Sequence, residues 1–219
     1  MSDAFFSPIQ LSIKIAFVSL LIVFLLGIFL AKFMVNKKFK GKVIVETILL
    51  LPLVLPPTVI GFLLIVLFGN RSPLSKWIEW IFGQPVMFTW WAGVIASTVV
   101  ALPLMYQSAK TGFSTIDGAI EEAARVDGAG EWKVFFLVTM PLAYHALITG
   151  AILSFARALG EFGATLMFAG NIPGKTQTMS TAIYMSIESG NMKLAWLLVI
   201  TMILISFFML LIVTRFKKA

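Results

Sequence analysis

Five long runs of apolar residues divide the chain, and short polar segments separate them. The runs cover residues 15–31, 47–68, 86–106, 142–168 and 194–214. A helix needs about 20 apolar residues to cross a bilayer, so each run predicts one crossing. The segment 176–190 is half-polar and too short to cross, and it predicts a partial or re-entrant helix. We therefore expect an all-α integral membrane protein with five full transmembrane helices, or six if the partial helix is counted.

The composition supports a chain embedded in a membrane. Hydrophobic residues make up 59% and charged residues 12% of the 219 residues, whereas a soluble domain carries about 25% charged residues. So low a charged fraction excludes a soluble globular enzyme and a disordered chain. It also excludes a nucleic-acid-binding domain, because the positive charges flank the apolar runs and form no single basic face. With no cysteine and one histidine, His145, we expect no catalytic site and no metal site. Residues 1–219 are expected to form a single transmembrane domain.

The distribution of Lys and Arg predicts the orientation, because positive charge is enriched in cytoplasmic loops. With the loop 36–42 in the cytoplasm, five spans place eleven of these residues inside and five outside, with Arg157 within the membrane. Six full spans would leave eight on each side. We therefore expect the N-terminus outside and the C-terminus inside. No basic residue precedes Lys14 and no small-residue cleavage site follows the first run, so we expect a retained helix and not a signal peptide.

The segment 107–141 lies in the predicted cytoplasmic part and carries eight charged residues. Ser114 and Asp117 fit a capping pattern that predicts the start of a helix, and good helix formers follow. Gly128 interrupts this helix, and residues 132–138 predict a second short one. We expect two short helices joined by a sharp turn beneath the membrane, in a shape suited to docking into a groove. The alternative is an ordinary amphipathic connector.

Within this segment the sequence resembles the EAA loop of ATP-binding-cassette importer permeases. The pattern of that loop is E-A-A-x3-G-x9-I-x-L-P, and the chain matches it from Glu122 to Pro141, with Val138 and Met140 in place of Ile and Leu. In the family, the loop contains a coupling helix that inserts into a cleft of the ATPase subunit. The resemblance implies that the coupling residues are Glu121, Glu122, Ala123, Ala124, Arg125, Asp127, Gly128, Ala129 and Pro141.

A second resemblance concerns the substrate. Residues 156–165 and 170–176 are similar to molybdate permeases, and sulfate permeases have a similar stretch, usually with Tyr where this chain has Phe162. The resemblance implies an importer of an oxyanion, with molybdate expected and sulfate or tungstate as alternatives. It implies as partners an ATP-binding-cassette ATPase subunit, an extracytoplasmic oxyanion-binding protein and a second copy of the chain. It also implies a location among the lipids of a bacterial or archaeal cytoplasmic (inner) membrane.

One glycine-rich stretch is similar to a phosphate-binding P-loop only in composition. A P-loop has four residues between its glycines and follows a strand, whereas three residues separate Gly170 and Gly174 after an apolar run. We expect no nucleotide site and no cofactor in this chain, so ATP and Mg²⁺ would be bound by the partner ATPase subunit. An ATP-independent secondary transporter or channel is the alternative of another class, and one histidine without cysteine argues against a membrane enzyme.

Two charged residues interrupt the fourth apolar run. Arg157 and Glu161 are four residues apart, so they share one face of a helix. An isolated Arg at the bilayer centre costs about 2.5–3.5 kcal/mol, and an ion pair with Glu161 would reduce that cost. The pair either lies on the path of the anion or fixes helix packing, and the sequence leaves both interpretations open.

Prolines mark the second and third runs. Pro56, Pro57 and Pro103 each remove a backbone donor and predict kinks. Kinked helices are candidate gate elements, although prolines also occur in static membrane helices. Glu46 lies near the cytoplasmic end of the second run, and we expect it to contact Lys42 or the membrane interface.

Overall fold

The computed structural model describes residues 2–37, 39–69 and 72–218, and every regular element in these ranges is helical. In chain order the helices are α1 (Ser2–Asn36), α2 (Lys42–Val54), α3 (Pro57–Phe68), α4 (Pro73–Phe82), α5 (Trp90–Ser114), α6 (Gly118–Val126), α7 (Glu131–Val134), the π-helix η1 (Phe135–Thr139), α8 (Met140–Leu142), α9 (Tyr144–Leu159), α10 (Gly163–Phe168), α11 (Met179–Glu188) and α12 (Met192–Lys218). The predicted all-α class is confirmed.

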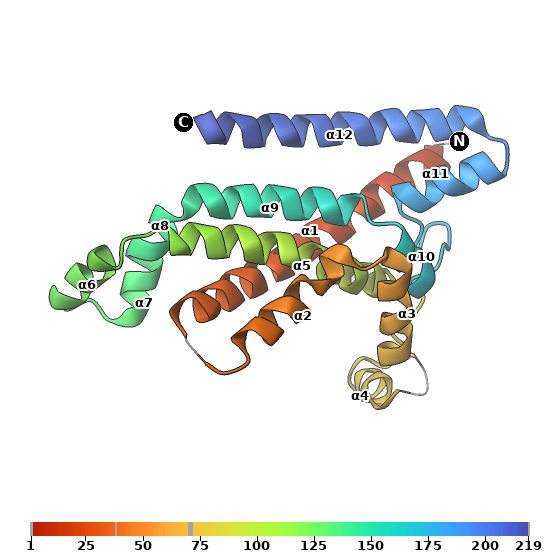
Figure 1. Cartoon of the computed structure of the whole chain (residues 1–219). Helices are drawn as coiled ribbons and strands as arrows, with labels where there is room; N and C mark the ends of the chain where they lie inside the picture. Colours follow the sequence, from red (N-terminus) through yellow and green to blue (C-terminus); the bar gives the residue numbers. More distant parts are fainter. Residues whose placement is uncertain (1, 38, 70–71, 219) are drawn as a thin grey trace.

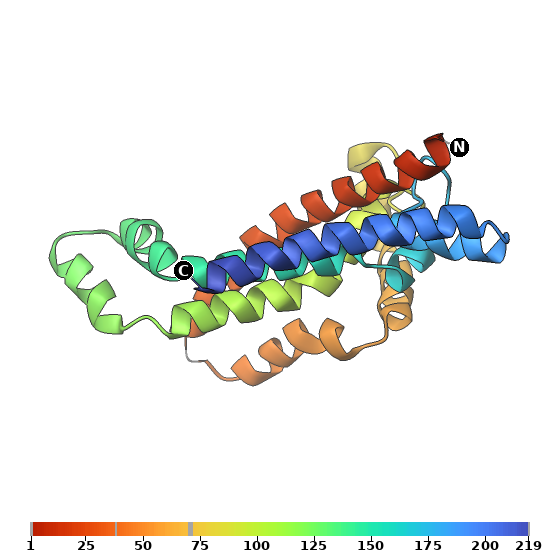
Figure 2. The same cartoon turned by 90° about the horizontal axis from the view of Figure 1, so that it is seen from above.

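The long helices lie alongside one another, and the short helices gather at the two ends of the molecule (Figures 1 and 2). At one end α6 and α7 project outward, and there α1 ends, α2 begins and α12 ends. At the other end lie the N-terminus, α4, α10 and the turn between α11 and α12. The loops with most of the predicted cytoplasmic charge therefore share one end.

Three helical stretches are long and apolar enough to cross a membrane alone, namely Asp3–Val35, Trp90–Ser114 and Met192–Ile212. Two pairs of helices reach that length only together. One is α2 with α3, bent by 117°, and the other is Glu131–Leu142 with α9, bent by 75°. The described residues thus contain three to five candidate spans, and the predicted five equals the upper number.

Two of the runs that predicted single spans are broken. Residues 47–68 divide between α2 and α3, because Pro56 and Pro57 lack backbone donors and Leu55 leaves the helical conformation. Residues 142–168 divide between α9 and α10, because the backbone leaves the helix over residues 160–162. The kink predicted at Pro56 and Pro57 is therefore confirmed, whereas the break after α9 was not predicted.

Two short helices, α4 and α11, are positioned by residues at their ends. The ten-residue α11 lies within the predicted partial helix 176–190, and the N–H of Met179 donates to the buried Ser12 hydroxyl of α1 at 2.7 Å. The helix α4 was not expected from the sequence. Ser72 caps its start and Gly83, with φ +68°, ends it, and these are residue types that mark helix ends.

Small residues let the central helices α1, α5 and α9 pack closely. A Cβ atom at Gly27 of α1 would lie 2.6 Å from the Cγ of Met105 in α5. A Cβ atom at Gly112 of α5 would lie 2.6 Å from the Cβ of Ala146 in α9. In lipid, helices associate through such close van der Waals packing, so these glycines set the distances between the three helices.

We expect Gly112→Val to destabilise the protein. Overpacking a tight contact costs about 1–3 kcal/mol, which lowers the midpoint of thermal unfolding by about 2–12 °C in a chain of this length. Thermal unfolding in detergent measures the effect, and Gly130→Ala is the matched control because no atom lies within 4 Å of a Cβ at that position. Equal midpoints for both variants would contradict the packing argument.

Candidate functional site

The start of α6 is fixed by an aspartate. The Asp117 carboxylate accepts a hydrogen bond from the N–H of Ala119 at 3.0 Å, which makes Asp117 the N-cap. Ser114 is instead the last residue of α5, and its hydroxyl donates to the carbonyl of Thr111 at 2.9 Å. The predicted cap at Ser114 is therefore wrong, because α5 continues past the apolar run and uses that serine.

The end of α6 is fixed by a glycine. Gly128 has φ +88°, a conformation that residues with a Cβ rarely adopt. Its N–H donates to the carbonyl of Arg125 and the N–H of Ala129 donates to the carbonyl of Ala124, each at 3.0 Å. These two bonds form a Schellman motif, and the sharp turn predicted at Gly128 is confirmed. No atom lies within 4 Å of a Cβ at this position, so the constraint on Gly128 is the backbone angle and not space.

One face of α6 is tied to the rest of the protein by ion pairs. Glu121 accepts from the Lys32 ammonium of α1 at 2.8 Å and from the Thr139 hydroxyl of η1 at 2.5 Å. Arg125 donates to Glu131 of α7 at 2.6 and 3.2 Å. Burial raises the pKa of the Glu121 carboxyl, but the hydrogen bonds from Lys32 and Thr139 outweigh it and lower the pKa below its ordinary value. Glu121 therefore stays ionised and holds α6 to α1 and η1.

The other face of α6 is free of such ties and is exposed. Ala119, Glu122, Ala123 and Val126 follow the i, i+3, i+4, i+7 spacing of one helix face, and all four are exposed. The side chain of Val126 is 87% exposed. A short, largely apolar surface made of small residues therefore points away from the protein at its end.

The structure thus divides the predicted coupling residues into separate roles. Glu121 and Arg125 face inward, and Glu122, Ala123 and Asp127 are exposed. The turn that ends α6 is built from Ala124, Gly128 and Ala129. Pro141 lies apart from these residues in the chain, as an exposed residue of α8.

The predicted pair of Arg157 and Glu161 is present, but the two residues do not share a helix face, because α9 ends at Leu159 and Glu161 follows it. The Arg157 guanidinium donates to Glu161 at 2.7 Å, and Glu161 is 2% exposed. The second carboxylate oxygen of Glu161 accepts from the N–H of Ala164 at 2.8 Å, within the first turn of α10. Glu161 therefore joins the end of α9 to the start of α10, across the non-helical residues 160–162 that separate the two helices.

Two of the predicted gate prolines lie at this same place. A Cβ atom at Gly163 would lie 2.9 Å from the Cβ of Pro57, so the bend after Pro56 meets the break after α9. Pro103 is different, because it is buried inside α5, which remains one helix from Trp90 to Ser114. The structure therefore brings Pro56 and Pro57 to the loop of Glu161 and leaves Pro103 in the core.

Glu46 pairs with Lys110 and not with Lys42, one of the two contacts expected for it. Its carboxylate accepts from the Lys110 ammonium at 2.8 Å and from the Tyr106 hydroxyl at 3.2 Å, so it ties α2 to α5. Sequence reasoning also missed Lys32 and Thr139 as partners of Glu121. Local spacing does not reveal these pairs, since 64 and 89 residues separate Glu46 from Lys110 and Lys32 from Glu121.

The glycine-rich stretch after α10 follows a helix, as expected from its sequence. The buried Thr176 hydroxyl accepts from the N–H of Ile172 at 2.9 Å, so it closes a turn of the chain itself. Among the described residues, no group of three or more His, Cys, Asp or Glu side chains is placed to hold a metal ion.

Comparison with known proteins places these features in a family. The family described as "Binding-protein-dependent transport system inner membrane component" matches residues 23–219. YvgM of Bacillus subtilis (strain 168) is 59% identical over 216 residues, which cover 99% of this chain and 95% of that protein. The molybdenum transport system permease protein ModB of Escherichia coli (strain K12) is 40% identical over 189 residues, which cover 86% of this chain and 82% of that protein.

Solved structures share the fold. A bacterial alginate ABC transporter, solved with an alginate pentasaccharide-bound periplasmic protein, has a chain with a TM-score of 0.77 and 20% identity, covering 100% of this chain and 80% of its own. The inward-facing MetNI methionine ABC transporter has a chain with a TM-score of 0.75 and 15% identity, covering 98% of this chain and 94% of its own. The family match and these relatives show that the chain belongs to the binding-protein-dependent transport system inner membrane components.

Proposed function

We propose that this chain is the permease subunit of an ATP-driven importer that moves molybdate by alternating access. Its similarity to permeases named for molybdenum transport supports the substrate, and its family supports the role of a translocation subunit. Tungstate and sulfate are the alternatives of the same chemical class. The chain itself performs no hydrolysis in this proposal, because ATP and Mg²⁺ belong to a separate ATPase subunit.

The observation that carries the proposal is the division of α6 into two faces. The outer face is exposed and carries the small residues Ala119 and Ala123, which suits a surface that docks into a cleft. The inner face is tied to α1 by Lys32–Glu121 and to α7 by Arg125–Glu131. A displacement of a docked ATPase subunit would therefore move α6, α7 and the end of α1 together.

The two ends of the molecule have different tasks in this mechanism. At the α6 end, ATP-driven closure of the ATPase subunits pulls the coupling segment and changes the angles between the long helices. At the other end, the two helix breaks that meet at Pro57 and Gly163 form the gate. The Arg157–Glu161 pair holds α10 against this gate. The ATPase changes the populations of the two states only because it binds them with different affinity.

The proposed partners follow from the same arrangement. Three candidate spans, or five with the bent pairs, are few for enclosing a solute path, so a second copy of the chain completes it. An extracytoplasmic oxyanion-binding protein delivers the anion to the end that carries α4, α10 and α11. In this proposal the α6 end faces the cytoplasm, because the end of α1 and the start of α2, near which the lysines cluster, lie at that end; the N-terminus is then outside and the C-terminus inside.

Reconstitution tests the function directly. The chain is placed in proteoliposomes with its ATPase subunit and its binding protein, and uptake of molybdate, tungstate and sulfate is measured with and without ATP. We expect molybdate uptake that requires ATP and both partners, with sulfate uptake at least tenfold slower. Equal or faster sulfate uptake would reassign the substrate, and uptake by the chain without an ATPase would refute the ATP-driven role.

We expect Gly128→Leu to uncouple the transporter. A side chain at φ +88° costs about 1–2 kcal/mol, which unwinds the turn that presents α6. Uptake should fall at least tenfold in the assembled complex, while Gly128→Asn should retain most of it, since Asn tolerates this backbone conformation. Full uptake by a correctly assembled Gly128→Leu complex would contradict the docking role.

A double-mutant cycle tests the tie between α1 and α6. Lys32→Met and Glu121→Gln should each lower stability, and the double variant should lose less than the sum of both, with a coupling energy of about 0.5–3 kcal/mol. The ratio of anion uptake to ATP hydrolysis should fall in each single variant. Additive losses of stability, together with an unchanged ratio of uptake to ATP hydrolysis, would show that the pair transmits no motion. Lys133→Met is the control for the loss of a nearby positive charge.

A further inference from the structure

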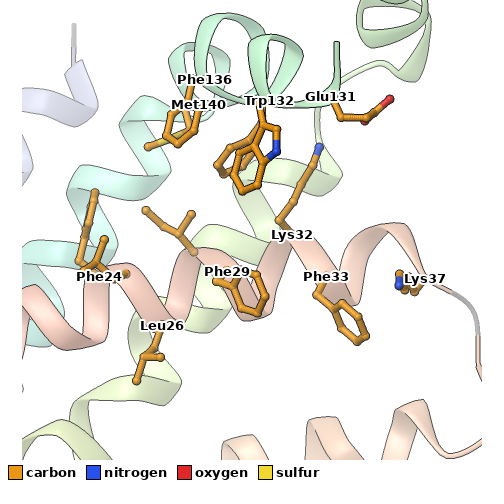
Figure 3. A pocket seen from close by; sticks show the side chains of 13 residues that line it. Phe24, Leu26, Phe29, Lys32, Phe33, Lys37, Glu131, Trp132, Phe136 and Met140 are labelled. Atoms are coloured by element: carbon orange, nitrogen blue, oxygen red, sulfur yellow. The ribbon is translucent and has the colours of Figure 1, made fainter.

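A groove with a volume of about 740 Å³ lies between α1 and the arm formed by α7 and η1 (Figure 3). Thirteen residues line it, of which ten are apolar. Phe29 comes from the α1 side, and Trp132 and Phe136 come from the arm. The remaining three lining residues are Lys32, Lys37 and Glu131.

The walls of the groove carry exposed aromatic and aliphatic side chains. Leu25 is 70%, Phe29 67%, Trp132 75% and Phe136 55% exposed. Trp132 and Phe136 stack with their ring centroids 6.1 Å apart and their planes 15° apart, so they form a flat wall. In a protein of the inner membrane, such a surface at the end of a spanning helix fits an acyl chain.

The rim of the groove is positively charged. Residues 32–42 contain five lysines and no acidic residue, and α1 ends within this stretch. The Lys32 ammonium is held by Glu121, whereas the Lys37 ammonium lies over the ring of Phe33, 4.7 Å from its centroid. The one acidic lining residue, Glu131, has its charge compensated by Arg125 at 2.6 Å. A lysine cluster directly at the end of a membrane helix attracts anionic lipid head groups.

We propose that this groove is a binding site for an anionic phospholipid. One acyl chain lies along Phe29, Trp132 and Phe136, and the phosphate lies near the ammonium of Lys37. An apolar wall alone would accept any lipid, so the lysines at the rim provide the preference for negative charge. The proposal requires only that the chain lies in a membrane, and it is independent of the transported anion.

The position of the groove gives the lipid a means to influence coupling. Its two walls belong to α1 and to the α7–η1 arm, and α6 is tied to both of them by Lys32–Glu121 and Arg125–Glu131. A lipid between the walls stabilises one separation of the arm from α1. Since a ligand favours the conformation that it binds best, the lipid would bias the position of the coupling segment.

Quenching of Trp132 fluorescence tests the site in the full-length chain. The protein is placed in nanodiscs with increasing fractions of brominated phosphatidylglycerol or brominated phosphatidylcholine, and the signal of a Trp132→Tyr variant is subtracted to isolate Trp132. We expect half-maximal quenching at a fraction of brominated phosphatidylglycerol at least threefold lower than that of brominated phosphatidylcholine. Lys37→Gln should reduce this preference, and Lys133→Gln, a nearby lysine outside the groove, should leave it unchanged.

Two results would overturn the proposal. Equal quenching by both lipids would mean that Trp132 contacts bulk lipid without a site. Absence of quenching by either lipid would mean that protein, such as a second copy of the chain, covers the groove. Native mass spectrometry of the wild-type chain and Lys37→Gln gives an independent readout that needs no tryptophan variant, and equal retention of phosphatidylglycerol by both would also refute the role of Lys37.

Discussion

Backbone groups inside a bilayer have no water to bond, and this constraint decides where a membrane chain can break. Two of the breaks in the protein's helices, the one before Pro57 and the one after α9, meet where Gly163 approaches Pro57. Glu161 satisfies the N–H of Ala164 at the start of α10. The break after α9 is partly buried by protein, with Glu161 and Ala164 buried, whereas Pro56 and Pro57 stay exposed. The two breaks lie together in one small region.

The helix α1 connects the two ends of the molecule (Figure 2). Lys32, near its end, holds α6, and Ser12, twenty residues earlier, holds the start of α11. Twenty residues of helix span roughly 30 Å, which is about the thickness of the hydrocarbon core. Gly27 lies between these two contacts and packs directly on Met105 of α5. A rotation of α1 produced at the coupling end would therefore act on α5 and on α11 through contacts of a single rigid element.

The sequence predicted those features that depend on neighbouring residues. The apolar runs, the turn at Gly128 and the pairing of Arg157 with Glu161 each follow from local composition or from short spacing in the chain. The ion pair between Lys32 and Glu121 joins residues far apart in the chain, so no local pattern predicts it. The same reason explains why the two faces of α6 were not separated and why Lys110 was not predicted as the partner of Glu46.

The apolar runs predicted the lengths of the helices poorly, for a different reason. Hydropathy reports the part of a helix that lipid surrounds, but a helix continues into water as long as its backbone bonds and side-chain contacts allow it. Thus α1 extends on both sides of the run 15–31, and α5 continues to Ser114. Pro103 lies buried inside α5, which continues as one helix from Trp90 to Ser114. By contrast, Pro56 and Pro57 are exposed and adjacent, and there the chain does bend.

Two lysines at the end of α1 would separate the proposed transmission of force from the proposed recognition of lipid. Lys32 lines the groove, but its ammonium is bound to Glu121, so loss of its charge changes both the tie to α6 and the rim of the groove. Lys37 also lines the groove and contacts the ring of Phe33, outside the network of Glu121. Substitution of Lys37 therefore changes the charge offered to a lipid and leaves the tie in place. If transport depends on lipid charge through the groove, the effect of Lys37 on transport should vanish in a bilayer without anionic lipid, whereas the effect of Lys32 should persist.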